Sequence, residues 1–133
     1  MTESNKGLEA GRAMRRKVLG GELVDQGAKA AWPFAQPYMD FITEHVWGAV
    51  WTRPGLSPRD RSLLNLGMLA AMGRGQELGI HLNGALNNGL TAEEIREIFI
   101  QVGAYCGAPL GQEAFRVARK VFEERGLTPE KKP

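Results

Sequence analysis

Glu77 and His81 are the two side chains best suited to acid–base chemistry, and they stand four residues apart in the stretch ELGIHLNGALNNG. On a helix this spacing puts both side chains on one face. A carboxylate beside an imidazole fixes the tautomer of the ring and raises its basicity, so the second ring nitrogen can transfer a proton or bind an anion. A structural or surface pair has the same spacing and is the alternative. The small neighbours Gly79 and Gly84 suit a pocket beside His81, although they equally suit close contact between helices.

Arg53 and Arg61 are the cations that could hold a carboxylate, because a guanidinium donates two parallel hydrogen bonds to it. Arg61 could equally form a structural ion pair with Asp60 or Glu77. The second histidine, His45, is either a pocket residue or an interfacial histidine with one hydrogen-bonded nitrogen.

Cys106 is the only cysteine, so an internal disulfide is excluded, and the sequence has neither Cys-x-x-Cys nor a Cys/His zinc pattern. It stands near the C-terminal end of a predicted helix, where the helix dipole does not favour a thiolate. Lining a pocket or the core is therefore favoured over nucleophilic attack. With two histidines in the whole chain, a histidine-rich metal site is also disfavoured, and we expect no metal.

The composition indicates one helical domain over residues 1–133. With 43% hydrophobic residues and no run of eighteen apolar ones, the chain is predicted to have its own core and not to span a membrane. Its 17 basic and 15 acidic residues are interspersed and give a net charge of +2, which disfavours nucleic-acid binding. The polar N-terminus lacks the apolar run of a secretory signal, which predicts a cytoplasmic protein.

The residue pattern is helical almost throughout and shows no strand pair, so the expected fold class is all-α with about six helices. The expected helices cover residues 7–19, 37–51, 58–72, 76–87, 92–106 and 110–125. Residues 1–36 are expected to be partly irregular, and residues 127–133 to form a polar tail. Two helix starts are marked locally: Ser57 and Pro58 suit the N-cap and first position of one helix, and Thr91 with Glu94 suits a capping box.

Apolar residues predict which helix faces are buried. Residues 63–72 are apolar nearly all round, so burial on most sides is expected. The stripe expected to be buried in the 37–51 helix consists of Tyr38, Phe41, Ile42, Val46 and Val50. The almost wholly apolar helix over residues 63–72, together with Trp32, Trp47 and Trp51, exceeds what six short helices can cover, and a homo-oligomer is therefore predicted.

The stretch WGAVWTRPGLSPRDRSLLNLGMLAAMGRGQELGIHLNGALNNGLTAEEIREIFIQVGAYCGAP resembles the carboxymuconolactone decarboxylase family, and the likeness extends to RRKVLGGELVD and AFRVARKVF. The resemblance implies an AhpD-like all-α fold that assembles into trimers or hexamers. It also implies conversion of 4-carboxymuconolactone to 3-oxoadipate enol-lactone in the β-ketoadipate pathway of aromatic catabolism, with no metal or organic cofactor.

The wider superfamily contains alkylhydroperoxidases, whose redox motif is a glutamate followed later by Cys-x-x-Cys-x-x-x-His. Aligning that histidine with His81 puts Arg74 and Glu77 at the cysteine positions and Ser62 at the glutamate position. Dithiol peroxidase chemistry is therefore excluded, because it requires the two sulfurs.

The reaction implied by the resemblance assigns roles to the residues above. As the carboxylate departs, its electrons delocalise through the ring alkene to the lactone carbonyl, and the resulting dienolate is protonated on carbon. We assign His81 as proton donor or hydrogen-bond donor to the carbonyl, Glu77 as the group that orients it, and Arg53 as the clamp for the second carboxylate. The further candidates for substrate binding are His45, Trp47, Tyr105, Cys106 and Arg61.

Two other functions are compatible with the sequence. One is a residual peroxidase or reductase that acts through Cys106, against which the missing second cysteine argues. The other is a non-catalytic helical oligomer that binds a small acidic ligand or another protein.

Overall fold

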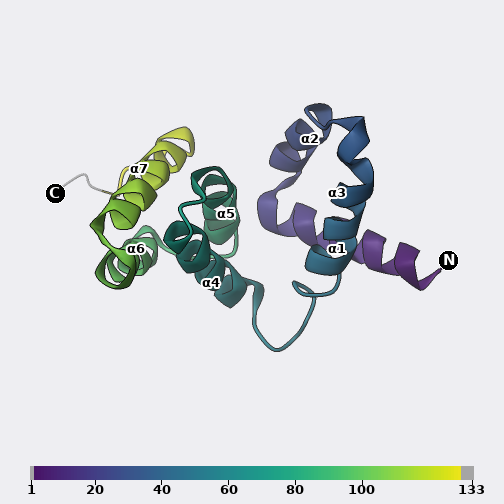
Figure 1. Cartoon of the computed structure of the whole chain (residues 1–133), viewed down its shortest axis with the longest axis horizontal. Coiled ribbons are helices and arrows are strands. Elements are labelled where there is room, and N and C mark those ends of the chain that lie inside the picture. The colour runs from purple at the N-terminus through teal and green to yellow at the C-terminus, as the bar shows by residue number, and fades with distance from the viewer. Residues whose placement is uncertain (1, 130–133) are drawn as a thin grey trace. The chain divides into compact units, whose positions relative to one another are not determined.

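The computed structural model describes residues 2–129, which form helices, turns and loops and contain no strand (Figure 1). The predicted all-α fold class is confirmed for this range. Residues 130–133 of the predicted polar tail lie outside it. No helix in the described range is long and apolar enough to cross a membrane. The chain divides into two compact units, Met1–Pro58 and Arg59–Pro133, and the single domain over 1–133 stays a prediction.

The N-terminal unit contains three α-helices and two short helical segments. They are α1 (Glu3–Leu19), α2 (Gly21–Lys29), the 3-10 turn η1 (Pro33–Ala35), α3 (Gln36–Ile42) and the π-helical turn η2 (Thr43–Trp47). α1 begins earlier than predicted, because the side chain of Thr2 caps it by accepting a hydrogen bond from the Asn5 N–H at 3.2 Å.

Within residues 1–36, which are expected to be partly irregular, residues 21–29 form the helix α2. Gly20, at φ 87°, ends α1, and α2 starts directly after it. Arg16 on α1 donates to both carboxylate oxygens of Asp25 on α2, at 2.9 and 3.3 Å, and so joins the two helices. With α2, the described range contains seven α-helices instead of about six.

Glycines allow α1 and η2 to approach backbone to backbone. A Cβ atom on Gly11 would overlap the carbonyl oxygen of Thr43, and one on Gly48 would overlap the carbonyl oxygen of Gly7. Only glycine fits such contacts. A π-helical turn is rare, and here it lies at the closest approach of the two segments.

The buried side of the segment from 37 to 51 differs by one residue from the predicted stripe. Thr43 and Trp47 are buried, and Trp51 stacks on Trp47 with ring centroids 4.9 Å apart. The exposed members of the predicted stripe are Tyr38, Phe41, Val46 and Val50. The contact at the glycines turns positions 43 and 47 toward α1, so the side chains one position earlier point elsewhere.

The helices of the C-terminal unit are labelled α4 to α7 in Figure 1. They are α4 (Pro58–Ala71, in this unit from Arg59 on), α5 (Gly75–Asn87), α6 (Ala92–Cys106) and α7 (Ala108–Glu124). Their buried side chains form one core. The predicted first position of Pro58 and the predicted capping box of Thr91 and Glu94 are both confirmed. Gly89, at φ 95°, follows the C-terminal end of α5.

The core of this unit draws on all four helices, yet α4 contributes only one side. The residues of α4 in the core are Leu66 and Ala70, packed with Leu78, Leu82 and Phe99 among others. Within the single chain α4 is not buried on most sides, since Leu63, Leu64 and Met68 on its opposite side are exposed. An apolar sequence shows that a helix can be buried, but the number of neighbours decides how many sides are.

Candidate active site

His81 lies on α5, between the fully buried Leu78 and Leu82 in sequence, and is itself half-buried. Its Nδ1 atom is 3.4 Å from Nδ2 of Asn65, which belongs to α4. Burial lowers the pKa of His81 below its ordinary value of 6.5, because a charged imidazolium loses solvation there. At neutral pH the ring is therefore neutral, with one donor and one acceptor nitrogen.

Glu77 lies one turn before His81 on α5, as predicted, and is exposed. A carboxylate that held the imidazole would favour the charged ring and raise its pKa, whereas the pKa of His81 is lowered. One contact of the ring is with Asn65 on the neighbouring helix. An orienting role for Glu77 stays a prediction.

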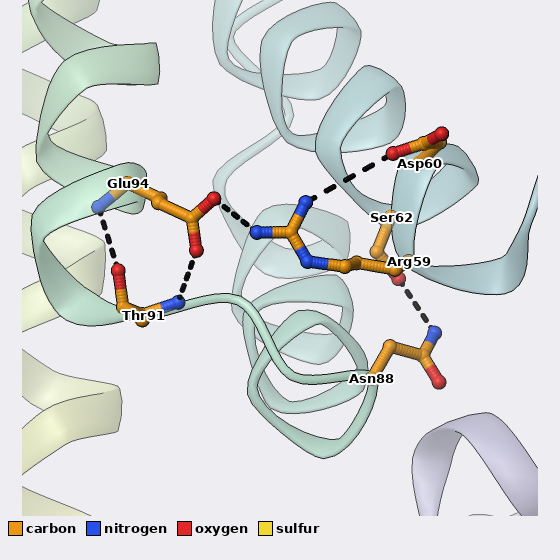
Figure 2. Close-up of polar contacts among 6 residues, drawn as sticks. All are labelled: Arg59, Asp60, Ser62, Asn88, Thr91 and Glu94. Atoms are coloured by element: carbon orange, nitrogen blue, oxygen red, sulfur yellow. Dashed lines mark hydrogen bonds and ion pairs between the residues drawn. The ribbon is translucent and has the colours of Figure 1, made fainter.

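Two polar contacts hold the first turns of α4 against the rest of the unit (Figure 2). Asn88, at the end of α5, donates from Nδ2 to the hydroxyl of Ser62 at 2.9 Å. Arg59 donates to Glu94 in the first turn of α6. Ser62 is fully buried, so its hydroxyl needs such a partner. Together these contacts set the position of α4, and with it the position of Asn65.

Glu94 serves two contacts at once, as Figure 2 shows. Its carboxylate accepts a hydrogen bond from the Thr91 backbone N–H at 3.1 Å and another from Arg59. The hydrogen bond from Arg59, and then that from Thr91, hold the pKa of Glu94 below its usual range, and the same bond raises the pKa of Arg59. The carboxylate of Glu94 therefore belongs both to the capping box of α6 and to the contact with Arg59 that holds α4.

Tyr105 and Cys106 line a groove of about 390 Å³ between α4 and α6, and both are exposed. The α4 residues in the groove are Leu63, Leu64, Gly67, Met68 and Ala71. Asn65 is absent from this lining and points to α5, so the groove and the His81 contact lie on different sides of α4. The structure thus does not bring Tyr105 and Cys106 together with His81 within this unit, and their contact with substrate stays a prediction.

Three of the predicted site residues, Trp47, His45 and Arg53, belong to the N-terminal unit. Trp47 is buried and stacks on Trp51, which makes it part of the packing of that unit. His45 is exposed, and its ring lies 4.5 Å from that of Phe41, centroid to centroid. Arg53 is exposed in the turn that follows.

Arg61 lies half-buried in the first turn of α4, in the C-terminal unit. Its predicted alternative partner Asp60 is 3.9 Å from Nη1 of Arg59. The substrate-binding roles of Arg61, His45, Trp47 and Arg53 stay predictions.

Sequence reasoning missed Asn65 as a site residue. A signal was present, because Ser62 and Asn65 are polar positions, one turn apart, in an otherwise apolar stretch. Polar side chains that a fold buries need hydrogen-bond partners, so such positions in an apolar helix indicate specific contacts.

The described residues form an all-helical fold with a half-buried histidine, whose ring contacts an amide from a neighbouring helix and whose pKa is lowered by burial. The chain belongs to the carboxymuconolactone decarboxylase family, which matches residues 36–120. The resemblance seen in the sequence is therefore confirmed.

Two relatives cover most of the chain. Nitrosuccinic acid decarboxylase of Metarhizium robertsii is 43% identical over 117 residues, which are 88% of this chain and 82% of that protein. The 4-carboxymuconolactone decarboxylase of Acinetobacter baylyi is 38% identical over 121 residues, 91% of this chain and 90% of that protein. Both relatives are decarboxylases, which supports a carboxy-lyase activity for this chain.

Proposed function

We propose that this chain is a cofactor-independent decarboxylase of a small dicarboxylate, and that it converts 4-carboxymuconolactone to 3-oxoadipate enol-lactone in the β-ketoadipate pathway. The observation that carries the proposal is the likeness to a 4-carboxymuconolactone decarboxylase over 91% of the chain. His81 supplies a group suited to the chemistry, because a neutral imidazole offers one N–H donor at a half-buried position.

The reaction needs no external electron acceptor. The bond between the ring carbon and its carboxylate breaks, carbon dioxide leaves, and the electron pair moves through the ring alkene onto the lactone carbonyl oxygen. A proton added to the carbon beside that carbonyl then restores the carbonyl and completes the enol-lactone. A hydrogen bond from His81 to the carbonyl oxygen would stabilise the dienolate, since a donor aimed at developing charge acts more strongly in the transition state.

Nitrosuccinic acid is a second candidate substrate, and the 43% identity to a nitrosuccinic acid decarboxylase favours it. The two substrates share a chemical plan. Each loses one carboxylate, keeps another, and carries its own acceptor for the electron pair, a conjugated lactone carbonyl or a nitro group. In either case a hydrogen-bond donor at the acceptor oxygen, a proton for carbon and a cation for the retained carboxylate meet the need.

The test is a side-by-side assay of the purified chain with both substrates, following the loss of lactone absorbance and the release of carbon dioxide. The proposal expects turnover of 4-carboxymuconolactone with the larger kcat/KM. A preference for nitrosuccinic acid would transfer the assignment to the second candidate. Failure to release carbon dioxide from either substrate would refute the proposal and favour a binding protein.

Substitution of His81 tests its role. If His81 donates to the reacting substrate, His81→Ala lowers kcat/KM by roughly two to four orders of magnitude. Asn83→Ala is the matched control on the same helix, because Asn83 contacts Gly79 and Arg125 instead of His81. Near-wild-type turnover in a folded His81→Ala variant would remove His81 from the mechanism.

Arg53→Ala tests the clamp. Loss of a group that binds the retained carboxylate equally in the ground and transition states raises KM and leaves kcat nearly unchanged. A purely structural Arg53 would instead lower the melting temperature and leave the kinetics per folded site unaltered.

We also propose that the chain acts as a homo-oligomer, a trimer or hexamer. The support is the apolar surface of the C-terminal unit, where Met72 is 65% and Tyr105 85% exposed in the single chain. Exposed apolar patches of this kind commonly mark subunit contacts. Light scattering coupled to size-exclusion chromatography measures the assembly, and a monomer at micromolar concentration would contradict the proposal.

A further inference from the structure

α4 and α5 run antiparallel and are bridged by two polar contacts. Ser62, near the start of α4, accepts from Asn88 at the end of α5, and Asn65, one turn later on α4, meets His81, two turns earlier on α5. Both bridges lie on the side of α4 that also carries the core residue Leu66. These two contacts place the side-chain amide of Asn65 beside the imidazole of His81.

The atom of Asn65 that faces Nδ1 of His81 is the amide nitrogen Nδ2, at 3.4 Å. An amide NH₂ group donates and cannot accept. A hydrogen on Nδ1 would set two donors against each other, so Nδ1 must accept and the ring hydrogen must lie on Nε2. This distance is at the long end for a hydrogen bond, yet the choice of tautomer needs only that the unfavourable arrangement be avoided.

We propose that Asn65 is a positioning residue that holds His81 as the Nε2–H tautomer, so that Nε2 is the nitrogen that donates to the substrate. The role of Nε2 as donor to the substrate rests on the proposed decarboxylation. The tautomer of His81 follows from its contact with Asn65 and needs no substrate.

A neutral partner at this position has a chemical consequence. A carboxylate beside Nδ1 would accept from Nδ1–H, favour the charged ring and place the acceptor lone pair on Nε2 instead. An amide does the opposite. Burial of His81 acts in the same direction, because it lowers the pKa of the ring. The histidine is thereby prepared as a neutral donor to a developing oxyanion, and it is not prepared as a base.

The charged side chains one turn away on the two helices are Glu77, before His81 on α5, and Arg61, before Asn65 on α4. Glu77 is exposed and Arg61 half-buried. The other positions one turn from His81 and Asn65 on these helices are uncharged: Leu78, Gly84, Ala85, Ser62, Met68 and Leu69.

The anchors of α4 explain how a single amide can hold this geometry. Ser62 is fully buried with its hydroxyl bound by Asn88, and Arg59 ties the first turn of α4 to Glu94 (Figure 2). Asn65 stands one turn beyond these contacts, so its backbone is placed by them. The rotamer of its side chain is then set by the contact with His81.

The tautomer can be read directly by ¹⁵N NMR of the histidine ring nitrogens in the full chain without substrate. The chain has two histidines, so His45→Gln and His81→Gln assign the signals. We expect His81 at pH 7.5 to show an unprotonated Nδ1 and a protonated Nε2. A protonated Nδ1 in the wild-type chain would overturn the inference without any variant.

Asn65→Asp tests whether Asn65 causes the tautomer. The carboxylate is expected to move the ring hydrogen to Nδ1 and to raise the pH at which the ring titrates. It is also expected to lower kcat about 100-fold or more, as when an oxyanion donor is removed. The matched control is Asn83→Asp, the same change at a half-buried position on α5 that contacts Gly79 and Arg125, where the ring signals and kcat should stay as in the wild type.

The experiments distinguish failure of the positioning role of Asn65 from failure of the proposed decarboxylase function. An unchanged ring pattern in Asn65→Asp would show that another group sets the tautomer and would overturn the positioning role. If the wild type shows the expected tautomer but releases no carbon dioxide, the proposed function falls and the structural assignment of Asn65 stands. Should Asn65→Asp not fold, Asn65→Ala provides the second variant, and a mixture of the two tautomers is its expected result.

Discussion

Ser62→Ala removes one oxygen atom from the seam that positions α4. Ser62 is 0% exposed, and its hydroxyl accepts from Nδ2 of Asn88 at 2.9 Å. Alanine keeps nearly the same shape but takes away this acceptor from a half-buried amide. Loss of one such hydrogen bond costs about 1–2 kcal/mol, so we expect the free energy of unfolding to fall by that amount.

Urea denaturation followed by far-UV circular dichroism measures this change. The midpoint should move to lower urea with the slope unchanged, because the surface exposed on unfolding is the same. Ser4→Ala is the matched control, since Ser4 is exposed and its hydroxyl donates to Glu44 at 3.1 Å. That control should stay within about 0.5 kcal/mol of the wild type.

A double-mutant cycle with Asn88→Ala separates the hydrogen bond from other effects of the serine. If the bond carries the loss, Ser62→Ala costs less in the Asn88→Ala background than in the wild type. A second readout is kcat, which should fall because Asn65 follows Ser62 by one turn and loses its support. A Ser62→Ala variant as stable as Ser4→Ala would refute the view that this contact anchors α4.

Because burial lowers the pKa of His81 in the folded state, the neutral ring contributes fully to the free energy of unfolding above pH 6.5, and this contribution is lost as the pH falls through the lowered pKa. His81→Gln should therefore flatten this part of the curve of stability against pH, measured by urea titration at a series of pH values. The pKa of Glu94 is lowered mainly by Arg59, so the stability that the carboxylate contributes above pH 4.5 is lost on further acidification. Glu94→Gln keeps a side chain suited to the capping box and should make the stability less sensitive to acid. An unchanged midpoint of acid unfolding would contradict the role of the ion pair. Gly11→Ala forces a Cβ atom into a carbonyl oxygen of the π-helical turn and should destabilise the chain by about 1–3 kcal/mol. Gly27→Ala, with nothing within 4 Å of the added atom, should instead stabilise the chain by about 0.4–1 kcal/mol. Equal melting temperatures for the two variants would contradict the close contact at Gly11.

Helix ends were the part of the fold most open to prediction. The capping box of Thr91 and Glu94, the first position of Pro58 and the positive φ of Gly89 all depend on residues next to one another in the chain. Their hydrogen bonds and backbone preferences act over three or four residues. Local sequence therefore contains all the information that these boundaries need.

Burial was less predictable, because it depends on the neighbouring elements. The apolar spacing of the 37–51 segment pointed to Val46 and Val50, but the close contact of Gly11 with η2 turns Thr43 and Trp47 inward. On α4 the apolar residues surround the helix, yet packing covers only the side that bears Leu66. The pattern of apolar side chains indicates which faces of a helix can be buried, and the contacts between elements determine which of them are buried.

The same division holds for the candidate site. The sequence by itself determined that His81 stands on a helix one turn after Glu77, that sulfur redox chemistry has no second cysteine, and that the chain resembles a decarboxylase family. Only the tertiary structure decided that the ring meets Asn65, sixteen residues earlier in the chain. The reason is physical: the i to i+4 spacing acts within one helix, whereas the contact of Asn65 with His81 exists because two antiparallel helices are held in register by the bond between Ser62 and Asn88.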